Sequence, residues 1–168
     1  GVTIRIKKRI PVAAGLGGGS SDAAAVLRGL NQGWKLGLSL KELAQLSLSI
    51  DSDVPYCVYS RTAHVTGHGE QVEVLRSFPH YWAVVAKPKI SVSTPTILRQ
   101  INYEKLQHLD VDSLVECIQA GRWQESFAYM GNVLEPVTMK EYPEIRQLKQ
   151  RMEKLGADVV QMSGTGPT

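Results

Sequence analysis

The feature that most constrains this chain is a run of glycine followed at once by alanine, in the segment PVAAGLGGGSSDAAA at residues 11–25. Four glycines stand between positions 15 and 19. Because glycine has no Cβ, several backbone N–H groups of such a segment can approach one ligand closely. The alanine-rich stretch at residues 22–30 favours a helix, whose first N–H groups and positive dipole end attract anions. This order predicts an anion site, with phosphate as its natural ligand.

Two familiar phosphate-binding templates do not fit this segment. A Walker loop requires a lysine and then serine or threonine after its last glycine, whereas Gly19 is followed by two serines and Asp22. A dinucleotide-binding fingerprint requires a glycine three positions after Gly17, where Ser20 stands. The other alternative is a flexible surface turn, but a linker would not run directly into an alanine-rich helix. We expect Ser20 or Ser21 to be the N-cap of that helix, with Asp22 in its first turn.

Composition places the chain among ordinary globular proteins, since 43% of its 168 residues are hydrophobic and 21% are charged. The net charge of +3 suits an anionic ligand but falls short of the basic face of a nucleic-acid-binding protein, so no nucleic-acid partner is predicted. Cys57 and Cys117 are far apart and form no disulfide or zinc motif, which favours a cytoplasmic protein. No apolar run approaches the roughly 20 residues of a membrane helix, so no membrane partner is predicted.

Both ends of the sequence resemble the interior of a longer protein. Residues 2–6 already alternate as an amphipathic strand, and residues 163–168 stop within a glycine-rich turn. We therefore expect the natural protein to continue beyond both ends.

Periodicity and turn residues predict an α/β chain with a break near residue 78, which divides it into domains 1–77 and 78–168. A hairpin is expected at residues 62–74, turning on Gly67 and Gly69. His64 and His68 would lie on this hairpin, and because their spacing suits a metal only on a helix, no metal ligand is predicted. Further strands are expected at residues 2–10, 82–86 and 158–162. Helices are expected to begin or run at residues 22–30, 39–50, 93–95, 112–120, 122–130 and 143–156.

The pattern of Pro11, Gly15, Leu16 and Gly17, followed by small residues and alanine, resembles the phosphate-binding motif of the GHMP superfamily. That superfamily comprises galactokinase, homoserine kinase, mevalonate kinase and phosphomevalonate kinase. Most of its members carry serines where this chain has Gly18 and Gly19, and the form with glycine is similar to one branch. Three further stretches resemble motifs of that branch, in the same order and at the same spacing. They lie at residues 51–55, 87–95 and 162–168.

The resemblance implies a two-domain α+β kinase fold, with a ribosomal-protein-like first domain and a ferredoxin-like second domain. It implies a kinase that uses ATP and Mg²⁺ to phosphorylate the 2-hydroxyl of 4-diphosphocytidyl-2-C-methyl-D-erythritol, in the non-mevalonate route to isoprenoid precursors. The partners would be this small molecule and ATP, and the chain would be a monomer or a weak homodimer. The family's motif with a lysine near the reacting hydroxyl, and the residues that stack on cytosine, would lie upstream of Gly1.

For nucleotide binding, the resemblance implies the glycine segment and the residues on either side of it. These residues are Pro11, Val12, Ala13, Ala14, Gly15, Leu16, Gly17, Gly18, Gly19, Ser20 and Ser21. Lys8, just before them, is either a contact to nucleotide or substrate or a solvent-facing lysine.

Phosphoryl transfer also needs a carboxylate that orients the acceptor hydroxyl and takes its proton. The resemblance assigns this role to Asp53, which stands directly before a Val-Pro pair, and makes Asp51 its rival. Without the resemblance, an aspartate after a helix is more often a turn former. The resemblance further implies substrate contacts at Thr94, Gly164 and Gly166. Alternatively, Thr94 belongs only to a capped helix start and the two glycines only to a turn.

Two other functions stay open at this point. One is another kinase of the superfamily, such as mevalonate or homoserine kinase, against which Gly18 and Gly19 argue. The other is a non-catalytic nucleotide-binding or RNA-binding module, which the pI near 8.9 and a ribosomal-type fold would permit.

Overall fold

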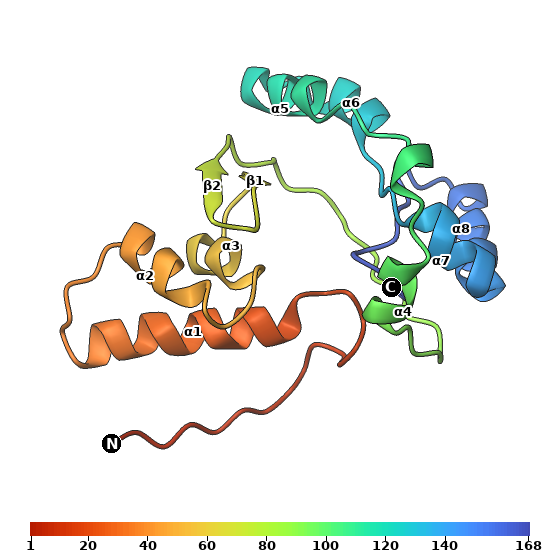
Figure 1. The fold of residues 1–168 in the computed structure, drawn as a ribbon. Helices are drawn as coiled ribbons and strands as arrows, with labels where there is room; N and C mark the ends of the chain where they lie inside the picture. The colour runs from red at the N-terminus through yellow and green to blue at the C-terminus, as the bar shows by residue number, and fades with distance from the viewer. The chain divides into compact units, whose positions relative to one another are not determined.

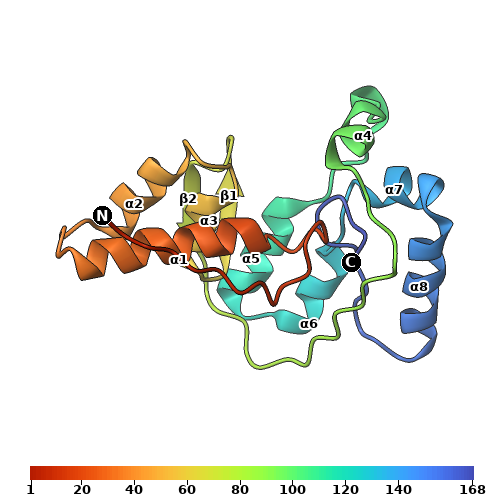
Figure 2. The ribbon, with the colours of Figure 1, turned by 90° about the horizontal axis from the view of Figure 1, so that it is seen from below.

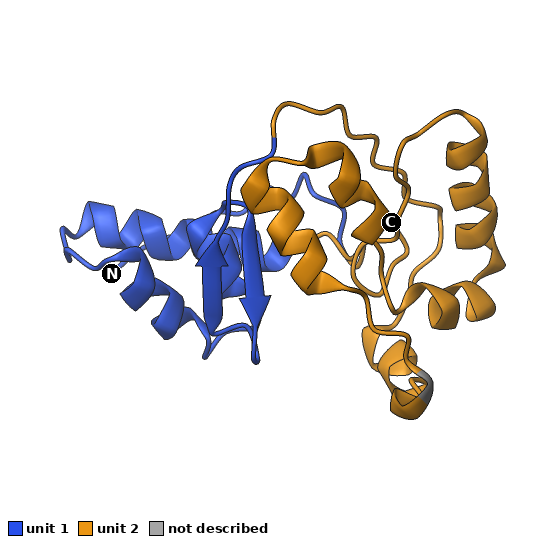
Figure 3. Ribbon diagram, turned by 90° about the horizontal axis from the view of Figure 1, so that it is seen from above, with its two compact units in different colours: residues 1–12, 17–78 blue, residues 13–16, 79–168 orange. Residues whose placement is uncertain are grey.

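The computed structural model describes residues 1–104 and 106–168, together with the backbone of the short helix that includes position 105. These residues form two compact units (Figure 3). The first unit contains Gly1–Val12 and Gly17–Phe78, and the second contains Ala13–Leu16 and Pro79–Thr168. Each unit has its own cluster of buried apolar side chains. The glycine segment therefore contributes residues to both units.

The first unit contains three helices followed by a hairpin (Figure 1). Helix α1 is Gly18–Gly33, α2 is Leu40–Ser47 and α3 is Val54–Tyr59, and the antiparallel strands are β1, Ala63–Thr66, and β2, Gln71–Val74. The hairpin confirms the prediction for residues 62–74. It places His64 on β1 and His68 in the turn, so these two residues do not share a helix face.

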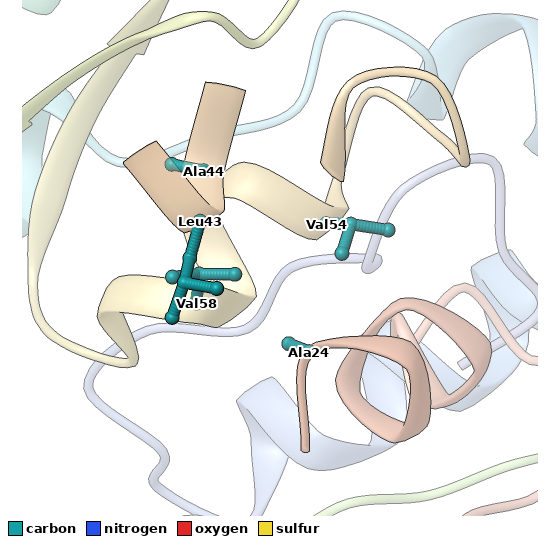
Figure 4. Packing of buried hydrophobic residues seen from close by; sticks show 5 residues of the cluster. All are labelled: Ala24, Leu43, Ala44, Val54 and Val58. Carbon is teal, nitrogen blue, oxygen red and sulfur yellow. The ribbon is translucent and has the colours of Figure 1, made fainter. Parts of the chain in front are cut away.

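One apolar cluster holds the three helices of this unit together (Figure 4). Its members are almost fully buried, because α1 presents alanine to its neighbours and α3 presents valine. They are Ala24, Leu43, Ala44, Val54 and Val58. Such close packing around small side chains fixes where the starts of α1 and α3 lie.

The helix starts were predicted from local capping residues, with mixed results. Ser39 and Glu42 form the predicted capping box of α2, although this helix ends at Ser47 rather than near residue 50. Ser93 precedes α4, Thr94–Arg99, and Pro95 lies in its first turn, but the Ser93 side chain makes no capping hydrogen bond. Helix α3 was not predicted; it begins directly after Asp53, with a proline in its first turn.

The second unit is mostly helical, and the predicted helices in it are confirmed within a few residues. Gly121 closes α5 in a left-handed conformation, as a C-terminal glycine commonly does. Helix α7 was not predicted. The elements are α4, Thr94–Arg99; η1, Tyr103–Lys105; α5, Val111–Ala120; α6, Trp123–Ser126; η2, Phe127–Tyr129; α7, Glu135–Glu141; and α8, Pro143–Lys154. The buried cluster of this unit comprises Val92, Ile97, Met139, Ile145 and Met162.

Three predicted strands, at residues 2–10, 82–86 and 158–162, are wrong. All three are irregular, and the first runs as an extended tube in Figure 2. A strand is stable only when its backbone groups pair with a neighbouring strand. Within the described residues the sheet consists of β1 and β2 alone. The apolar side chains of two of these segments are consequently exposed, and Trp82 is fully so.

Candidate functional site

The glycine segment adopts the backbone conformation that its composition favours. Ala13, Gly15 and Gly17 all have positive φ, with values of 51°, 73° and 59°. Positive φ is uncommon for a residue with a Cβ, so Ala13 is held there by its surroundings. Turns that contain left-handed residues direct successive N–H groups toward one point, which makes them suitable for anions.

Helix α1 begins at Gly18, earlier than the predicted caps allow. Gly17 occupies the N-cap position and no side chain caps the helix. The first backbone bond runs from the Ser21 N–H to the Gly17 carbonyl at 2.9 Å. The prediction that Ser20 or Ser21 is the cap is therefore wrong, because both lie inside the helix. The N–H groups of the first three helical residues have no partner within the helix and are available to a ligand.

The space around the first two helical residues differs. A Cβ on Gly18 would lie 2.9 Å from Ile10 Cγ2 and 3.4 Å from Lys8 Nζ, whereas a Cβ on Gly19 would meet no atom within 4 Å. Lys8 is ion-paired with Asp22, and both side chains are about one-third exposed. Lys8 is thus engaged beside the helix start. The prediction that Asp22 lies in the first turn of α1 is wrong, because the helix begins at Gly18 and Asp22 lies beyond that turn.

The two aspartates between α2 and α3 have different environments. One Asp51 carboxylate oxygen accepts a hydrogen bond from the buried Ser20 hydroxyl at 3.2 Å, and the other accepts the Ser52 N–H at 2.8 Å. Asp53 is exposed and does not cap α3, while its carbonyl accepts the Cys57 N–H at 3.2 Å. Burial, and secondly the nearby Asp53 charge, raise the pKa of the Cys57 thiol. Both aspartates are thus exposed, and they differ in that the side chain of Asp51 accepts two hydrogen bonds.

The second glycine loop, residues 162–166, lies against residues 13–16 in the second unit. The Ser163 hydroxyl donates to the Gly15 carbonyl at 2.7 Å, and a Cβ on Gly15 would lie 2.2 Å from the Ser163 carbonyl oxygen. The hydroxyls of Thr94 and Thr165 are 2.8 Å apart. The structure thus brings Thr94 together with the loop that contains Gly164 and Gly166.

Residues at the start of α7 hold this second loop, and sequence reasoning missed them. The Asn132 amide donates to the carbonyls of Met162 and Gly164 at 2.8 and 2.7 Å. Glu135 accepts the Met162 N–H at 2.7 Å and pairs with Lys149 at 2.7 Å. The contacts of Asn132 and Glu135 with the second loop join residues about 30 positions apart, and the motif itself contains no signal for them.

Other binding chemistries have little support among the described residues. No group of three or more His, Cys, Asp or Glu side chains there could hold a metal ion. Cys57 and Cys117 are both free thiols. None of the described helices combines the length and the apolar character that crossing a membrane requires.

Comparison with known proteins agrees with this geometry. Residues 1–61 match the family described as the GHMP kinases N terminal domain, and residues 114–168 match the GHMP kinases C terminal family. The chain belongs to the GHMP kinases, and the predicted family and α/β fold class are confirmed.

Its relatives include proteins named 4-diphosphocytidyl-2-C-methyl-D-erythritol kinase. The chain is 76% identical to the protein of that name from Limosilactobacillus fermentum, 72% to that from Limosilactobacillus reuteri and 66% to that from Levilactobacillus brevis. Each match covers 100% of this chain and 59% of the relative, so the chain spans less than two thirds of these proteins. A crystal structure of 4-(cytidine 5'-diphospho)-2C-methyl-D-erythritol kinase matches 96% of this chain and 57% of its own, with a TM-score of 0.72 and 32% identity.

Proposed function

We propose that the protein containing this chain is an ATP-dependent kinase that phosphorylates the 2-hydroxyl of 4-diphosphocytidyl-2-C-methyl-D-erythritol. The observation that carries this proposal is the 76% identity, along the whole chain, to a relative that is named for this substrate. The uncapped, glycine-lined start of α1 supports it, because that start offers backbone donors to a phosphate. No observation favours mevalonate kinase, homoserine kinase or an RNA-binding module.

We assign nucleotide binding to residues 11–21. In this proposal the N–H groups of Gly18, Gly19 and Ser20 donate to phosphate oxygens of ATP, and the dipole of α1 adds to the attraction. The space beside Gly19 is open, since an added Cβ there would meet no atom within 4 Å, and we assign this space to a phosphate oxygen. The glycines supply positioning and charge compensation, which are the main requirements of phosphoryl transfer.

Asp53 acts as the base for the acceptor. Its carboxylate orients the substrate hydroxyl and takes its proton as the hydroxyl oxygen bonds to the γ-phosphorus of ATP. The bond from that phosphorus to the bridging oxygen breaks at the same time, and ADP leaves. Asp53 suits this role better than Asp51: both residues are exposed, but both carboxylate oxygens of Asp51 already accept hydrogen bonds.

Substrate contacts are also assigned in the second unit. We assign contacts with the acceptor substrate to Thr94, Gly164 and Gly166, since Thr94 and the second glycine loop meet through Thr165. Mg²⁺ is expected to enter with ATP and to be held by phosphate oxygens and water. When bound, it neutralises phosphate charge.

We further propose that residues 1–77 belong to the ATP-binding N-terminal domain and residues 78–168 to the C-terminal domain. The family matches to residues 1–61 and 114–168 lie within these two stretches. The partners are then ATP and one small cytidyl substrate, with no nucleic acid or membrane. We assign the protein to the cytoplasm as a monomer or weak homodimer.

The test is a coupled assay of ADP release by the complete protein that carries this sequence. It compares the cytidyl-erythritol substrate with mevalonate and homoserine, and we expect release with the first alone. Asp53→Asn should lower kcat by about 10²–10⁴-fold while ATP affinity stays nearly unchanged. An active Asp53→Asn variant would remove Asp53 from the role. Tight, strongly salt-dependent RNA binding without turnover would contradict the kinase assignment.

A further inference from the structure

The loop at residues 51–53 is held by two elements that neither its motif nor the family match accounts for. We propose that Asp51 and Gly69 are positioning residues, which fix this loop to helix α1 and to the β1–β2 hairpin and thereby place the Asp53 carboxylate. This inference rests on the proposed role of Asp53 as the base. It concerns how the carboxylate is placed, and all the contacts that carry it lie within the first compact unit.

Asp51 connects the loop to the phosphate-binding helix. Its side chain accepts the Ser20 hydroxyl at 3.2 Å and the Ser52 N–H at 2.8 Å, and its carbonyl accepts the Val54 N–H at 3.2 Å. Ser20 is only 7% exposed and lies in the first turn of α1. Asp51 therefore joins the helix that carries the proposed phosphate donors to the N–H groups of the two residues that flank Asp53, Ser52 and Val54.

Gly69 holds the same loop from the hairpin. Its φ is +99°, and a Cβ at this position would lie 2.1 Å from the Ser52 carbonyl oxygen and 3.0 Å from the Ser52 carbonyl carbon. Both of these are backbone atoms, so a side chain at position 69 requires the loop itself to move. Only glycine permits this approach and this backbone conformation together.

These contacts leave Asp53 little freedom at its backbone. Ser52, on one side, lies close against Gly69 and donates its N–H to Asp51, and Val54, on the other side, is fully buried in the cluster with Val58. A misplacement of about 1 Å in a reacting group can cost on the order of 10²-fold in rate. A fixed loop therefore serves the reaction directly, and the engaged Asp51 carboxylate has a use other than proton transfer.

The experiment measures kcat, KM for ATP and thermal unfolding in four variants of the complete protein. Asp51→Ala removes both side-chain bonds, Asp51→Asn keeps the size of the side chain, and Gly69→Ala pushes on Ser52. Gly67→Ala is the matched control, because Gly67 also has positive φ in the hairpin turn but its Cβ would meet only the movable Glu70 side chain.

We expect Asp51→Ala and Gly69→Ala to lower kcat by about 10–100-fold. Asp51→Asn should lower it by about 5-fold, the value of one net hydrogen bond. KM for ATP should change less than about 3-fold in each, because the donors on α1 remain. Gly67→Ala should keep a kcat close to that of the unmodified protein.

Three results would overturn the inference: an Asp51→Asn variant as inactive as Asp53→Asn, an unchanged kcat in Asp51→Ala, or equal effects of the two glycine substitutions. Amide hydrogen exchange at Val54 separates this inference from the proposed function, since that N–H bonds to the Asp51 carbonyl. If the unmodified protein transfers no phosphate, the kinase proposal fails. Exchange at Val54 should still be faster in Asp51→Ala and Gly69→Ala than in Gly67→Ala, and equal rates would exclude the positioning role.

Discussion

Helices α1 and α2 belong to the same compact unit but begin in opposite ways. At α2, the Ser39 hydroxyl accepts the Glu42 N–H at 3.3 Å and the Glu42 carboxylate accepts the Ser39 N–H at 2.8 Å. At α1, Gly17 is the cap and no side chain serves the first N–H groups. Side chains of α2 and its N-cap therefore bond to the N–H groups at the start of α2, whereas no side chain caps α1, whose free N–H groups are the phosphate donors of the proposed function.

Tertiary burial does not explain the difference between these helix starts. Ala24 of α1 and Leu43 and Ala44 of α2 are buried in one cluster (Figure 4). Packing stabilises both helices, so neither depends on its cap alone in order to form. The difference is therefore local to the two helix starts, and single substitutions at each start can test it.

The largest effect is expected from Gly15→Ala, a substitution in the loop that precedes the proposed phosphate-binding start of α1. The added Cβ would lie 2.2 Å from the Ser163 carbonyl oxygen, at a residue with φ of +73°. Relief requires movement of the second glycine loop as well as backbone strain, so we expect a loss of about 2–4 kcal/mol in the free energy of unfolding. Urea denaturation measures this loss, and ATP titration should show weaker binding. Unchanged values of both would contradict the packing of these two loops.

The next largest effect is a difference in stability between substitutions at two neighbouring glycines of α1. Gly18→Ala places a Cβ 2.9 Å from Ile10 Cγ2, which we expect to cost about 1–3 kcal/mol by overpacking. Gly19→Ala meets no atom within 4 Å, so the better helix propensity of alanine should preserve stability or raise it by up to about 1 kcal/mol. Urea denaturation of the two variants distinguishes these outcomes.

ATP titration of the same pair tests whether the open space at α1 is used. The methyl group of Gly19→Ala would occupy that space, and we expect ATP affinity to fall by at least about 10-fold, or 1.4 kcal/mol. A Gly19→Ala variant that binds ATP as tightly as the unmodified protein would show that these donors are not the phosphate site.

The parts of the fold that could be predicted from sequence are those whose signals are local. The capping box of Ser39 and Glu42, the hairpin turn at Gly67 and Gly69, and the closure of α5 by Gly121 each depend on neighbouring residues only. The three wrong strands fail because pairing is not local. An alternating segment without a partner stays irregular, as residues 2–10 do.

The candidate site likewise has parts that local sequence signals predict and parts that depend on contacts between distant residues. Glycine content and the following alanines located the segment at residues 11–21, and the family motif favoured Asp53 over Asp51. The contact from Ser20 to Asp51 joins positions 31 apart, and Gly69 meets the Ser52 carbonyl across the hairpin. Such contacts arise from packing of α1, α3 and the hairpin, so the spacing of residues in the sequence cannot predict them.

A smaller loss of stability is expected from Ser39→Ala, which removes the N-cap hydroxyl of α2. Removal of an N-cap hydroxyl costs about 1 kcal/mol of stability, and the Ser39 hydroxyl also donates to Glu42 at 2.6 Å. Urea denaturation should show this loss, while ATP affinity stays unchanged because α2 is not part of the proposed site. If Ser39→Ala weakened ATP binding as much as Gly19→Ala, the two helix starts would not have separate roles.

The smallest effect is a pH dependence that arises at the start of α2. The Ser39 hydroxyl, and secondly the Ser39 backbone N–H, donate to the Glu42 carboxylate and lower its pKa from the ordinary value of 4.5. A carboxylate whose pKa is lower in the folded than in the unfolded state stabilises the fold above the unfolded value. That contribution is lost as the pH falls through the folded value, because the carboxyl group then becomes protonated.

Glu42→Gln removes this titration without removing the helix. We expect the stability difference between the unmodified protein and Glu42→Gln to be constant above about pH 5 and to shrink as the pH falls below the ordinary glutamate pKa. Thermal unfolding at a series of pH values measures it, with Glu153→Gln on α8 as a control for the loss of one carboxylate outside any capping box. A difference that grows in acid would reverse the sign and exclude an ionised Glu42 as the partner of Ser39. A loss equal to that of Glu153→Gln at every pH would show that the capping box adds nothing to the stability of α2, and the contrast with α1 would then concern ligand access alone.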